Sequence, residues 1–596
     1  MSPTFALGLD LGTTNCALAY LPLNRDDAPV ELLSIPQLVA PGQIESRPLL
    51  PSFLYLPAEA EKDQPAFRDG SPPENPGPVG ELARKQSADV PTRTIAAAKS
   101  WLAHHRVDRN QPILPWEAPE EVAKVSPVEA SAAYLRHLVA AWNHAHPDAL
   151  FHHQRVTLTV PASFDASARD LTRQAALAAG FPNDFILLEE PQAALYAWLA
   201  LQGEQWRKSL RVGDVILVCD VGGGTSDFTL ISVEERDGDL ELNRLAVGNH
   251  ILVGGDNMDL TLAHAMQQLF EEKGHAIDPW QAVSLWHACR AAKEDLFSHP
   301  DKSSAPVTIL GRGRSVIGKA ITADLTRDLL LRVLLHGFLP DCTLQDAPQR
   351  LRGSGFRQLG LPYESDTAIT RHLAHFLARN ARDGEAAIAP TRILFNGGVF
   401  KAADLRDRLT QILAHWFADH QTPALLEGHH DLDFAVARGA AAYGAIKERG
   451  GVRIRGGVPR AYYVGIETAG LAIPGAPRPL HALCVVPHGM EEGTSVQVPG
   501  GDIGLVVGEP VHFRFFSSAT RKDDTPGTLL TRWTPDELEE TDAMETALPS
   551  AENEEDGYVP VRFESRITEL GVLELWCVSA LGDERWKLEF SVREDD

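Results

Sequence analysis

The sequence predicts a duplicated α/β domain followed by an all-β sandwich domain. Two glycine-rich segments, FALGLDLGTTNCALAYL (5–21) and VILVCDVGGGTSDFTLISV (215–233), share a layout of a strand, an aspartate, a Gly-Thr turn and a second strand. Such self-similarity indicates an internal repeat. Strands and helices alternate after each of these hairpins, whereas short β-rich segments divided by glycine and proline follow in the C-terminal part.

The bulk composition limits the class of protein. A chain of 596 residues is too long for one hydrophobic core, so we expect several domains. The formal net charge of -26 disfavours binding to nucleic acid or to an anionic membrane. The 6 cysteines are far apart and lack metal-ligand spacing, which fits free thiols in a reducing compartment. Without a basic leader or a long apolar run, the sequence favours a cytoplasmic protein.

The region after the first hairpin reads as alternating strands and helices. RVTLTVPASF (155–164) predicts a strand, and DASARDLTRQAALAAGF (165–181) predicts a helix with an aspartate N-cap and a glycine stop. FILLEEPQAALYAWLA (185–200) continues as a strand, a loop and a helix. This order is typical of an α/β domain.

The region after the second hairpin closes in a similar way. TRILFNGGVF (391–400) predicts a strand that ends in a glycine turn, and the segments 402–417 and 433–448 predict helices. Between them and the hairpin, residues 340–390 are rich in proline and glycine and contain a positively charged loop before a helix, within 350–380. We expect this segment to be a surface insertion.

The composition changes near RGGVRIRGGVP (449–459), which lacks helical periodicity and predicts a linker. The expected domains are therefore 1–448 and 460–596. The second of these contains short strands divided by turns, as in a β-sandwich. An acidic run at 535–557 interrupts it and is expected to form a solvated, partly disordered loop.

The glycine turns predict a phosphate site. Consecutive backbone N–H groups in such turns can converge on a phosphate without interference from Cβ atoms. An aspartate opens each turn, Asp10 and Asp220, and would repel phosphate unless a hydrated Mg²⁺ lay between. Two ordinary hairpins with turn aspartates are the alternative, which the matched repeat makes less favourable. The groups expected to offer amides and hydroxyls are Thr13, Thr14, Gly223, Gly224 and Thr225.

Six motifs in order resemble the signatures of the 70-kilodalton heat-shock chaperone family, DnaK-like: LGLDLGTTNCALAY, VTLTVPASFDASARD, LLEEPQAALYAWL, ILVCDVGGGTSDFTLISV, VGGDNMDLTLA and ILFNGGVFKAADLRDRL. The similarity extends over residues 5–448. It implies an actin-like fold, in which two lobes with ribonuclease-H-like cores close on Mg-ATP. Sugar kinases and actins share that frame, but the PASF and EEPQAAL segments favour the chaperone branch.

The resemblance implies roles for individual residues. Asp10 and Asp220 become the aspartates that hold the metal through water, and Glu190 becomes a glutamate on the metal side or one that orients water. An N-capping acid on a helix is the alternative for Glu190. The implied chemistry is in-line attack of water on the γ-phosphate of ATP, giving ADP. Nucleotide contacts are implied for Gly12, Thr13, Thr14, Asn15, Gly222, Gly223, Gly224, Thr225, Lys293, Gly397, Gly398 and Asp433.

The sequence departs from the family pattern at two places in the site. Alignment of GELARKQ (80–86) with the segment of the catalytic lysine puts Arg84 at the lysine position. Arginine can neutralise phosphate charge but is not a compact ammonium, so we expect slow or altered hydrolysis; a solvated charge on a helix face is the alternative. The adenosine-contacting helix keeps Lys293 but has Arg290 in place of glutamate and Phe297 in place of serine.

The C-terminal part resembles the family's β-sandwich peptide-binding domain only at its first and last strands. The usual apolar, acidic linker is replaced by VRIRGGVP, and we expect no helical lid, so that clamping of a peptide in the usual manner is not expected. Apolar stripes on such strands are more often sandwich core than substrate groove. The expected partners are a protein or peptide client and a J-domain or nucleotide-exchange protein.

Three functions remain open at this point. The first is a lidless, ATP-dependent chaperone-like ATPase. The second is a nucleotide-dependent scaffold in which Arg84 leaves hydrolysis negligible. The third is a carbohydrate kinase on the same fold, which a β-sandwich tail disfavours.

Overall fold

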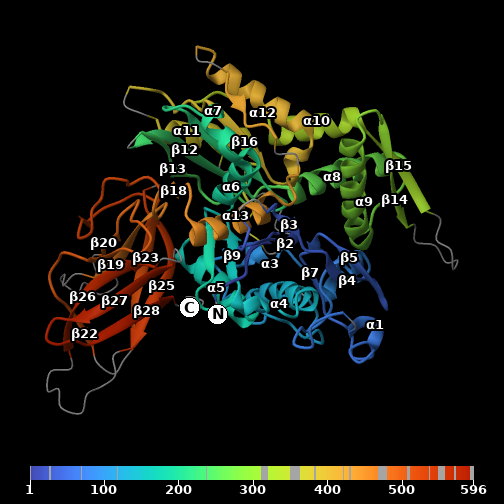
Figure 1. Cartoon of the computed structure of the whole chain (residues 1–596). Helices are drawn as coiled ribbons and strands as arrows, with labels where there is room; N and C mark the ends of the chain where they lie inside the picture. Colours follow the sequence, from blue (N-terminus) through green and yellow to red (C-terminus); the bar gives the residue numbers. More distant parts are fainter. Residues whose placement is uncertain are drawn as a thin grey trace, which may run out of the picture.

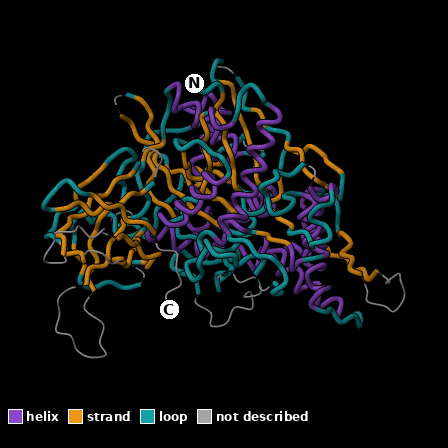
Figure 2. Tube along the Cα trace, turned by 90° about the horizontal axis from the view of Figure 1, so that it is seen from below, coloured by secondary structure: helices purple, strands orange, loops and turns teal. Residues whose placement is uncertain are grey.

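The protein consists of two α/β lobes and a β domain that lies beside them (Figure 1). Its computed structural model describes residues 2–590 except 26–27, 69, 117, 237, 311–319, 350–360, 362, 382–383, 420–421, 429–430, 468–479, 507–509, 536, 548–557 and 569–571. In the view from below, the β domain again lies to one side of the helix-rich lobes (Figure 2). The two lobes are called lobe I and lobe II in chain order.

Lobe I is built on a mixed sheet with the order β10-β9-β1-β2-β3. The first hairpin pairs β1 (Phe5–Leu11) with β2 (Asn15–Pro22) in antiparallel fashion. Strand β9 (Arg155–Val160) runs parallel to β1, and β10 (Ile186–Glu189) runs parallel to β9. The carboxyl ends of these parallel strands therefore point toward the glycine turn of the hairpin.

Lobe II repeats this arrangement with the order β17-β16-β11-β12-β13-β18. The second hairpin pairs β11 (Val215–Val221) with β12 (Ser226–Arg236), and β13 (Asp239–Val247) follows in antiparallel fashion. Strands β16 (Arg392–Asn396) and β17 (Ala424–Leu425) run parallel to β11. The internal repeat predicted from the two hairpins is thus present as two sheets of the same strand order.

Two helices fill the space between the sheets. Helix α6 (Glu190–Gln202) packs against α13 (Ala435–Arg449), which also lies on β1, β2 and β9. A Cβ atom on Gly439 would collide with the backbone carbonyl of Ala193, so glycine is required where the two helices cross. The lobes are therefore joined through closely packed small residues.

The remaining elements complete each lobe. Helix α5 (Ala166–Ala178) begins as predicted, because Asp165 accepts a hydrogen bond of 2.8 Å from the backbone N–H of Ala168. Lobe I also contains β3 (Glu31–Leu32), β4 (Ile35–Ala40), β5 (Gln43–Arg47), β6 (Leu50–Pro51), β7 (Phe53–Tyr55), β8 (Thr94–Ala96), α1 (Pro65–Arg68), α2 (Glu81–Asp89), α3 (Ala98–Trp101) and α4 (Pro127–Ala145). Lobe II also contains α7 (Trp206–Ser209), α8 (Gly255–Glu272), α9 (Pro279–Ser298), β14 (Ser304–Leu310), β15 (Ala320–Thr326), α10 (Arg327–Phe338), α11 (Ile369–Arg379) and α12 (Ala403–Trp416).

The segment 340–390 is more than the surface insertion expected. Helix α11 buries Ile369, Leu373 and Leu377 in the hydrophobic core of lobe II. Its apolar face has the spacing of an amphipathic helix, which explains why it packs inward. The positively charged loop at 350–360 lies outside the described residues.

The C-terminal β domain is confirmed. Its strands form one continuous hydrogen-bonded path, β21-β26-β27-β28-β25-β23-β19-β20-β24, with β22 paired to β26. The strands are β19 (Ala461–Glu467), β20 (Leu480–Val486), β21 (Ser495–Gln497), β22 (Ile503–Val506), β23 (Pro510–Ser518), β24 (Leu529–Leu530), β25 (Glu539–Ala547), β26 (Tyr558–Ile567), β27 (Leu573–Ser579) and β28 (Arg585–Phe590).

Part of the acidic run 535–557 was expected as a loop but forms strand β25. This strand pairs with β23 and β28 and buries Met544 in the domain core. Its carboxylates face cations: Asp542 pairs with the fully buried Arg109 of lobe I, and Glu539 lies 2.8 Å from Arg460. Charge pairing within the β domain (Glu539–Arg460) and across its contact with lobe I (Asp542–Arg109) therefore explains why an acidic segment is ordered here.

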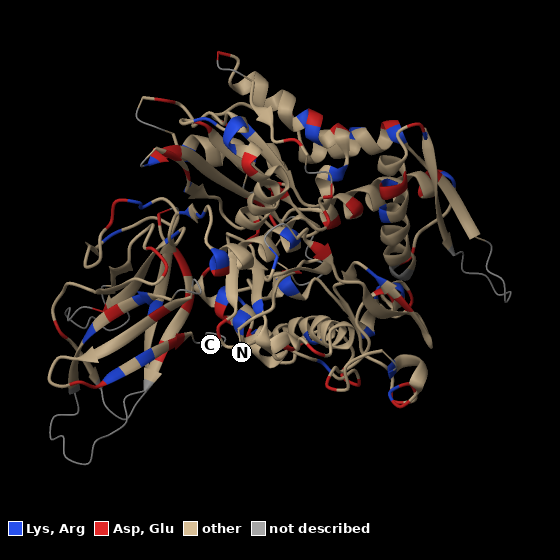
Figure 3. Ribbon diagram, in the orientation of Figure 1, with Lys and Arg blue, Asp and Glu red and all other residues tan. Residues whose placement is uncertain are grey.

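The predicted linker is hydrogen-bonded to lobe II. Its residues Ile454–Arg455 form β18, which pairs in parallel with β13 at the edge of the lobe II sheet. Basic and acidic residues are interspersed along the ribbons of the lobes and the β domain in Figure 3. No helix among the described residues is long and apolar enough to span a membrane.

Candidate functional site

The glycine turns of the two hairpins meet across a cleft between the lobes, with a cavity of about 390 Å³. A Cβ atom on Gly223 would collide with Oγ1 of Thr14, and one on Gly224 would lie 2.9 Å from Cγ2 of Thr13. The backbones of the two turns can therefore approach each other only because glycine occupies these positions.

Nearly all of the site residues predicted from the sequence come together in this cleft. Two of the predicted residues do not line the cavity. Gly224 packs against Thr13, and Arg84 lies on α2 outside the cleft. The predicted residues that line the cavity are Asp10, Gly12, Thr13, Thr14, Asn15, Glu190, Asp220, Gly222, Gly223, Thr225, Lys293, Gly397, Gly398 and Asp433.

Three carboxylates and one ammonium group form the polar centre of the cleft. The side chain of Lys99, only 7% exposed, forms an ion pair with Glu190. Burial raises the pKa of Glu190 to about 8 and that of Asp220 to about 7, although Lys99 lowers the first and a 2.8 Å hydrogen bond from Asn396 lowers the second. Burial also raises the pKa of Asp10. Burial alone would lower the pKa of Lys99, but Glu190 and Asp10 raise it.

The prediction that Arg84 occupies the lysine position is wrong. Arg84 lies on α2 with its side chain 44% exposed, and its Nη2 lies 2.8 Å from Oε2 of Glu81. Lys99 enters the cleft instead, because the chain turns at Ala97 in the left-handed region (φ 54) and begins α3. A single lysine among small and apolar residues in TIAAAKSWL is the signal that could have identified it.

The donor set fits a hydrated divalent cation and a phosphate chain. Three carboxylates against one ammonium leave an excess of oxygen ligands, which Mg²⁺ prefers. The carbonyl oxygen Oδ1 of Asn396 is buried beside Asp220 and has no hydrogen-bond partner among the residues that the structure describes. Gly397, at φ 85, brings its backbone so close that a Cβ atom would lie 2.8 Å from Oδ1 of Asp220.

Helix α9 forms one wall of the cleft and is tied to α8 by charge. Arg290 donates a 2.7 Å hydrogen bond to Asp259 and forms an ion pair with Asp256. The ammonium of Lys293 lies 2.6 Å from the other oxygen of Asp259. Lys293 therefore lines the cleft as predicted, but its charge is balanced by an aspartate that the sequence did not single out. Phe297 lines the same wall.

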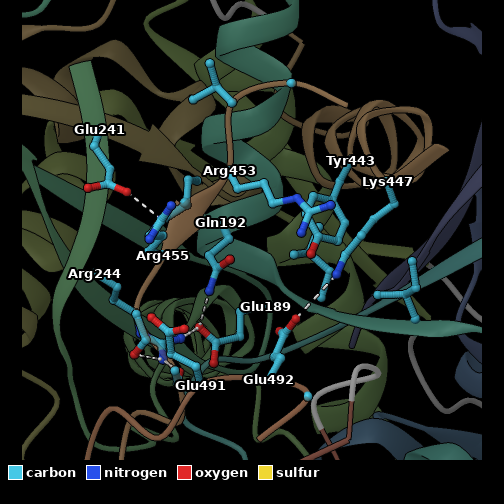
Figure 4. A pocket seen from close by; sticks show the side chains of 18 of the residues that line it. Glu189, Gln192, Glu241, Arg244, Tyr443, Lys447, Arg453, Arg455, Glu491 and Glu492 are labelled. Atoms are coloured by element: carbon cyan, nitrogen blue, oxygen red, sulfur yellow. Dashed lines mark hydrogen bonds and ion pairs between the residues drawn. The ribbon is translucent and has the colours of Figure 1, made fainter. Parts of the chain in front are cut away.

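A second, larger cavity of about 1370 Å³ lies where both lobes, the linker and the β domain meet (Figure 4). Glu189 stands in its wall and accepts hydrogen bonds from Arg169 (2.7 Å) and Gln192 (3.0 Å), and it forms an ion pair with Arg244. Burial alone would raise the pKa of Glu189, but Arg244 and Arg169 outweigh burial and lower it. This buried cluster was not predicted.

The same cluster holds the linker. Arg244 donates a 3.0 Å hydrogen bond to the carbonyl of Gly456 and another to that of Gly457. Gly456 lies so near that a Cβ atom would be 2.6 Å from Cβ of Arg244, and a Cβ atom on Gly457 would collide with the carbonyl of Gly489 in the β domain. The two glycines therefore allow the linker to pass between lobe II and the β domain.

The comparisons with known proteins point to a chaperone family. Residues 73–342 match the family model described as Hsp70 protein. The chaperone protein HscA homolog of Bordetella pertussis is 31% identical over 361 residues, which cover 59% of this chain and 49% of the relative. The HscA homolog of Methylobacillus flagellatus is 29% identical over 344 residues, 55% of this chain and 48% of the relative. The chain thus spans about half the length of the curated relatives it matches.

Proposed function

The chain is an Hsp70-like protein, and from that premise we propose that it is a chaperone-like ATPase in which nucleotide-driven closure of the lobes controls binding of a protein client or partner. The observation that carries this proposal is the buried Lys99–Glu190 ion pair, which lines the same cavity as Asp10, Asp220 and residues of both glycine turns. The repeated sheet order supports an actin-like frame with ribonuclease-H-like halves. We retain 1–448, 449–459 and 460–596 as the proposed nucleotide-binding, linker and substrate-binding-like parts.

Different residues of the cleft would bind the metal ion and the phosphates. Asp10 and Asp220 would hold Mg²⁺ through water, and the bound ion would neutralise phosphate charge. The backbone N–H of Gly223 would bind the phosphates, because glycine leaves it uncovered, whereas Gly224 packs against Thr13 and would hold the turn in place. Hydroxyls of Thr13, Thr14 and Thr225 would donate to phosphate oxygens from both turns.

Hydrolysis would depend mostly on positioning and charge. The ammonium of Lys99 pairs with Oε1 of Glu190, which fixes the orientation of this charge in the cleft. Glu190, with its pKa raised to about 8, can accept a hydrogen bond from water or hold a proton at neutral pH. Because Lys99 occupies the cleft, the reason for a non-hydrolysing scaffold, which rested on Arg84, no longer applies.

Control of a client would run through the linker. Glu189 directly precedes Glu190 in the chain and forms an ion pair with Arg244. Arg244 in turn donates a hydrogen bond to the linker carbonyl of Gly456. The β domain is in turn tied to lobe I by the Asp542–Arg109 ion pair. A change in lobe closure would therefore reach the β domain, where a client would bind. A J-domain or nucleotide-exchange protein remains a proposed partner.

Calorimetry with Mg-ATP followed by single-turnover hydrolysis on the purified chain tests this function. We expect binding and slow release of phosphate, both strongly reduced in Asp220→Asn. Binding without any phosphate release would favour the scaffold. ADP formation that appears only when a sugar is added would favour a carbohydrate kinase.

A further inference from the structure

We propose that Asn396 is a positioning residue of the metal site: its amide holds one carboxylate oxygen of Asp220 and leaves the other for hydrated Mg²⁺. This role rests on the proposed function, because it supposes that Asp220 holds a metal ion in the cleft. Asn396 belongs to neither glycine turn, so it adds a third segment of the chain to the site.

Strand pairing places Asn396 beside Asp220. Asn396 is the last residue of β16, which runs parallel to β11, and it is the register partner of Asp220. Its amide nitrogen Nδ2 donates a 2.8 Å hydrogen bond to Oδ2 of Asp220. Asn396 is 2% exposed and Asp220 is 8% exposed, so this hydrogen bond is shielded from water. The backbones of two paired strands therefore fix the contact.

The two carboxylate oxygens of Asp220 have different surroundings. Oδ2 is bound by Asn396, whereas Oδ1 accepts no hydrogen bond from the residues that the structure describes. Gly397 has φ 85, and a Cβ atom at this position would lie 2.8 Å from Oδ1. All three residues line the cleft cavity. Oδ1 is therefore the oxygen available to a hydrated metal ion, and glycine leaves it uncovered.

An amide at the end of this strand has a cost of its own. The three preceding residues, Ile393, Leu394 and Phe395, are buried and apolar. Oδ1 of Asn396 is buried without a hydrogen-bond partner among the described residues. Because a buried acceptor without a partner is unfavourable, an apolar side chain would suit the strand better. The benefit of asparagine here therefore lies in the hydrogen bond that it donates to Asp220.

Lobe I contains an equivalent contact. Asp10 lies on β1, and the fully buried Thr159 lies on the parallel neighbour β9. Oγ1 of Thr159 donates to Oδ1 of Asp10 at 3.3 Å, and it lies at the same distance from the carbonyl of Leu9. In both halves of the repeat, a polar side chain on the neighbouring parallel strand thus holds the aspartate. The repeated placement ties the role of Asn396 to the carboxylate.

The direction of a carboxylate affects how strongly it holds a metal ion. Partners that hydrogen-bond to such a carboxylate orient it, and their removal lowers metal affinity by about 10- to 100-fold. The same removal leaves the proposed phosphate contacts in place, since Asn396 contributes no group to them. Loss of the amide should therefore weaken the part of nucleotide binding that depends on Mg²⁺ and spare the rest.

Calorimetry of ADP binding to the full chain, with Mg²⁺ and with EDTA in its place, tests this role. Asn396→Leu keeps the branching at Cγ and removes the donor. We expect the strengthening of ADP binding by Mg²⁺ to fall by about 10- to 100-fold, while the affinity in EDTA is unchanged. Asn396→Thr supplies a hydroxyl donor like that of Thr159 and should recover part of the Mg²⁺ effect.

Asn143→Leu is the matched control. Asn143 lies on α4 outside the cleft and accepts a 2.8 Å hydrogen bond from the backbone N–H of Phe151. Its replacement should leave the affinity for ADP unchanged both with Mg²⁺ and with EDTA. If Asn396→Leu does not fold, Asn396→Ala takes its place with the same expected ratio.

Each contrary result has its own meaning. An undiminished Mg²⁺ effect in Asn396→Leu, or no Mg²⁺ effect in the unaltered protein, overturns the inference but leaves nucleotide binding intact. An equal loss of ADP affinity in Mg²⁺ and in EDTA shows that the amide only supports the fold of the cleft, and it also overturns the inference. The same holds if Asn396→Thr recovers nothing. If ADP does not bind the unaltered protein at all, the proposed function itself fails.

Discussion

Glu189 and Glu190 are consecutive residues whose side chains enter different cavities. Glu190 begins α6 and pairs with Lys99 in the cleft between the glycine turns. Glu189 ends β10 and pairs with Arg169 and Arg244 in the cavity beside the linker. A strand-to-helix junction can direct neighbouring side chains to opposite sides in this way. One peptide bond therefore connects the candidate nucleotide site to the residues that hold the linker.

Replacing Lys99 should abolish most of the hydrolysis. Lys99→Met removes the buried cation that interacts with Glu190, Asp10 and Asp220, and loss of a preorganised charge of this kind costs about 10²- to 10³-fold in rate. Single-turnover phosphate release measures the effect. Arg84→Met is the matched control, because Arg84 pairs with Glu81 outside the cleft. If Arg84→Met lowers the rate as much as Lys99→Met, the assignment of the cation made here is wrong.

The contact between lobe I and the β domain should weaken as the pH rises. His105 lies 3.8 Å from Asp165 at the start of α5 and 3.7 Å from Oδ2 of Asp542 on β25, the oxygen that also pairs with Arg109. Burial alone would lower the pKa of His105, but the two aspartates outweigh it and the repulsion from Arg109, and raise the pKa.

The sign of the effect follows from linkage. Since the folded pKa of His105 lies above its value in the unfolded chain, about 6.5, its contribution to stability is complete below that pH and is lost as pH rises through the folded pKa. Thermal unfolding between about pH 6 and pH 8.5 should show this loss in the unaltered protein. His105→Gln should flatten that part of the profile. An unchanged pH profile in His105→Gln would contradict the prediction.

The parts predicted from the sequence are those that a local signature determines. Asp10, Asp220 and the glycines of both turns were identified because each turn carries its aspartate and glycines within a few residues, and the repeat related the two turns. Lys99, Asp259 and Glu189 were missed because their roles depend on partners distant in sequence. Strand β25 was read as a loop for the same reason, since its acidic side chains are ordered by Arg109 and Arg460 from elsewhere in the fold.

Gly457→Ala should weaken the attachment of the linker to lobe II. Gly457 has φ 50 and a Cβ atom there would collide with the carbonyl of Gly489, so the substitution adds a steric clash to backbone strain. Amide exchange at Ile454 and Arg455 should become faster as β18 separates from β13. Gly450→Ala is the control, because Gly450 also has a positive φ (83) but no atom of the described part of the chain lies within 4 Å of the added Cβ. Equal effects of the two substitutions would show that strain alone, and not the contact with the β domain, is responsible.

Glu189→Gln should destabilise the protein and loosen the linker together. Removing the carboxylate leaves the guanidinium groups of Arg169 and Arg244 buried without compensation, which costs about 3 to 5 kcal/mol. Denaturant unfolding measures the loss, and amide exchange at β18 reports the linker, since Arg244 also binds the carbonyl of Gly456. Glu564→Gln is the control: Glu564 pairs with Arg585 in the β domain, whose side chain is 47% exposed, so its loss should cost about 0 to 1 kcal/mol. If Glu189→Gln unfolds like the control, or loses stability without faster exchange at β18, then Glu189 does not hold the linker through Arg244.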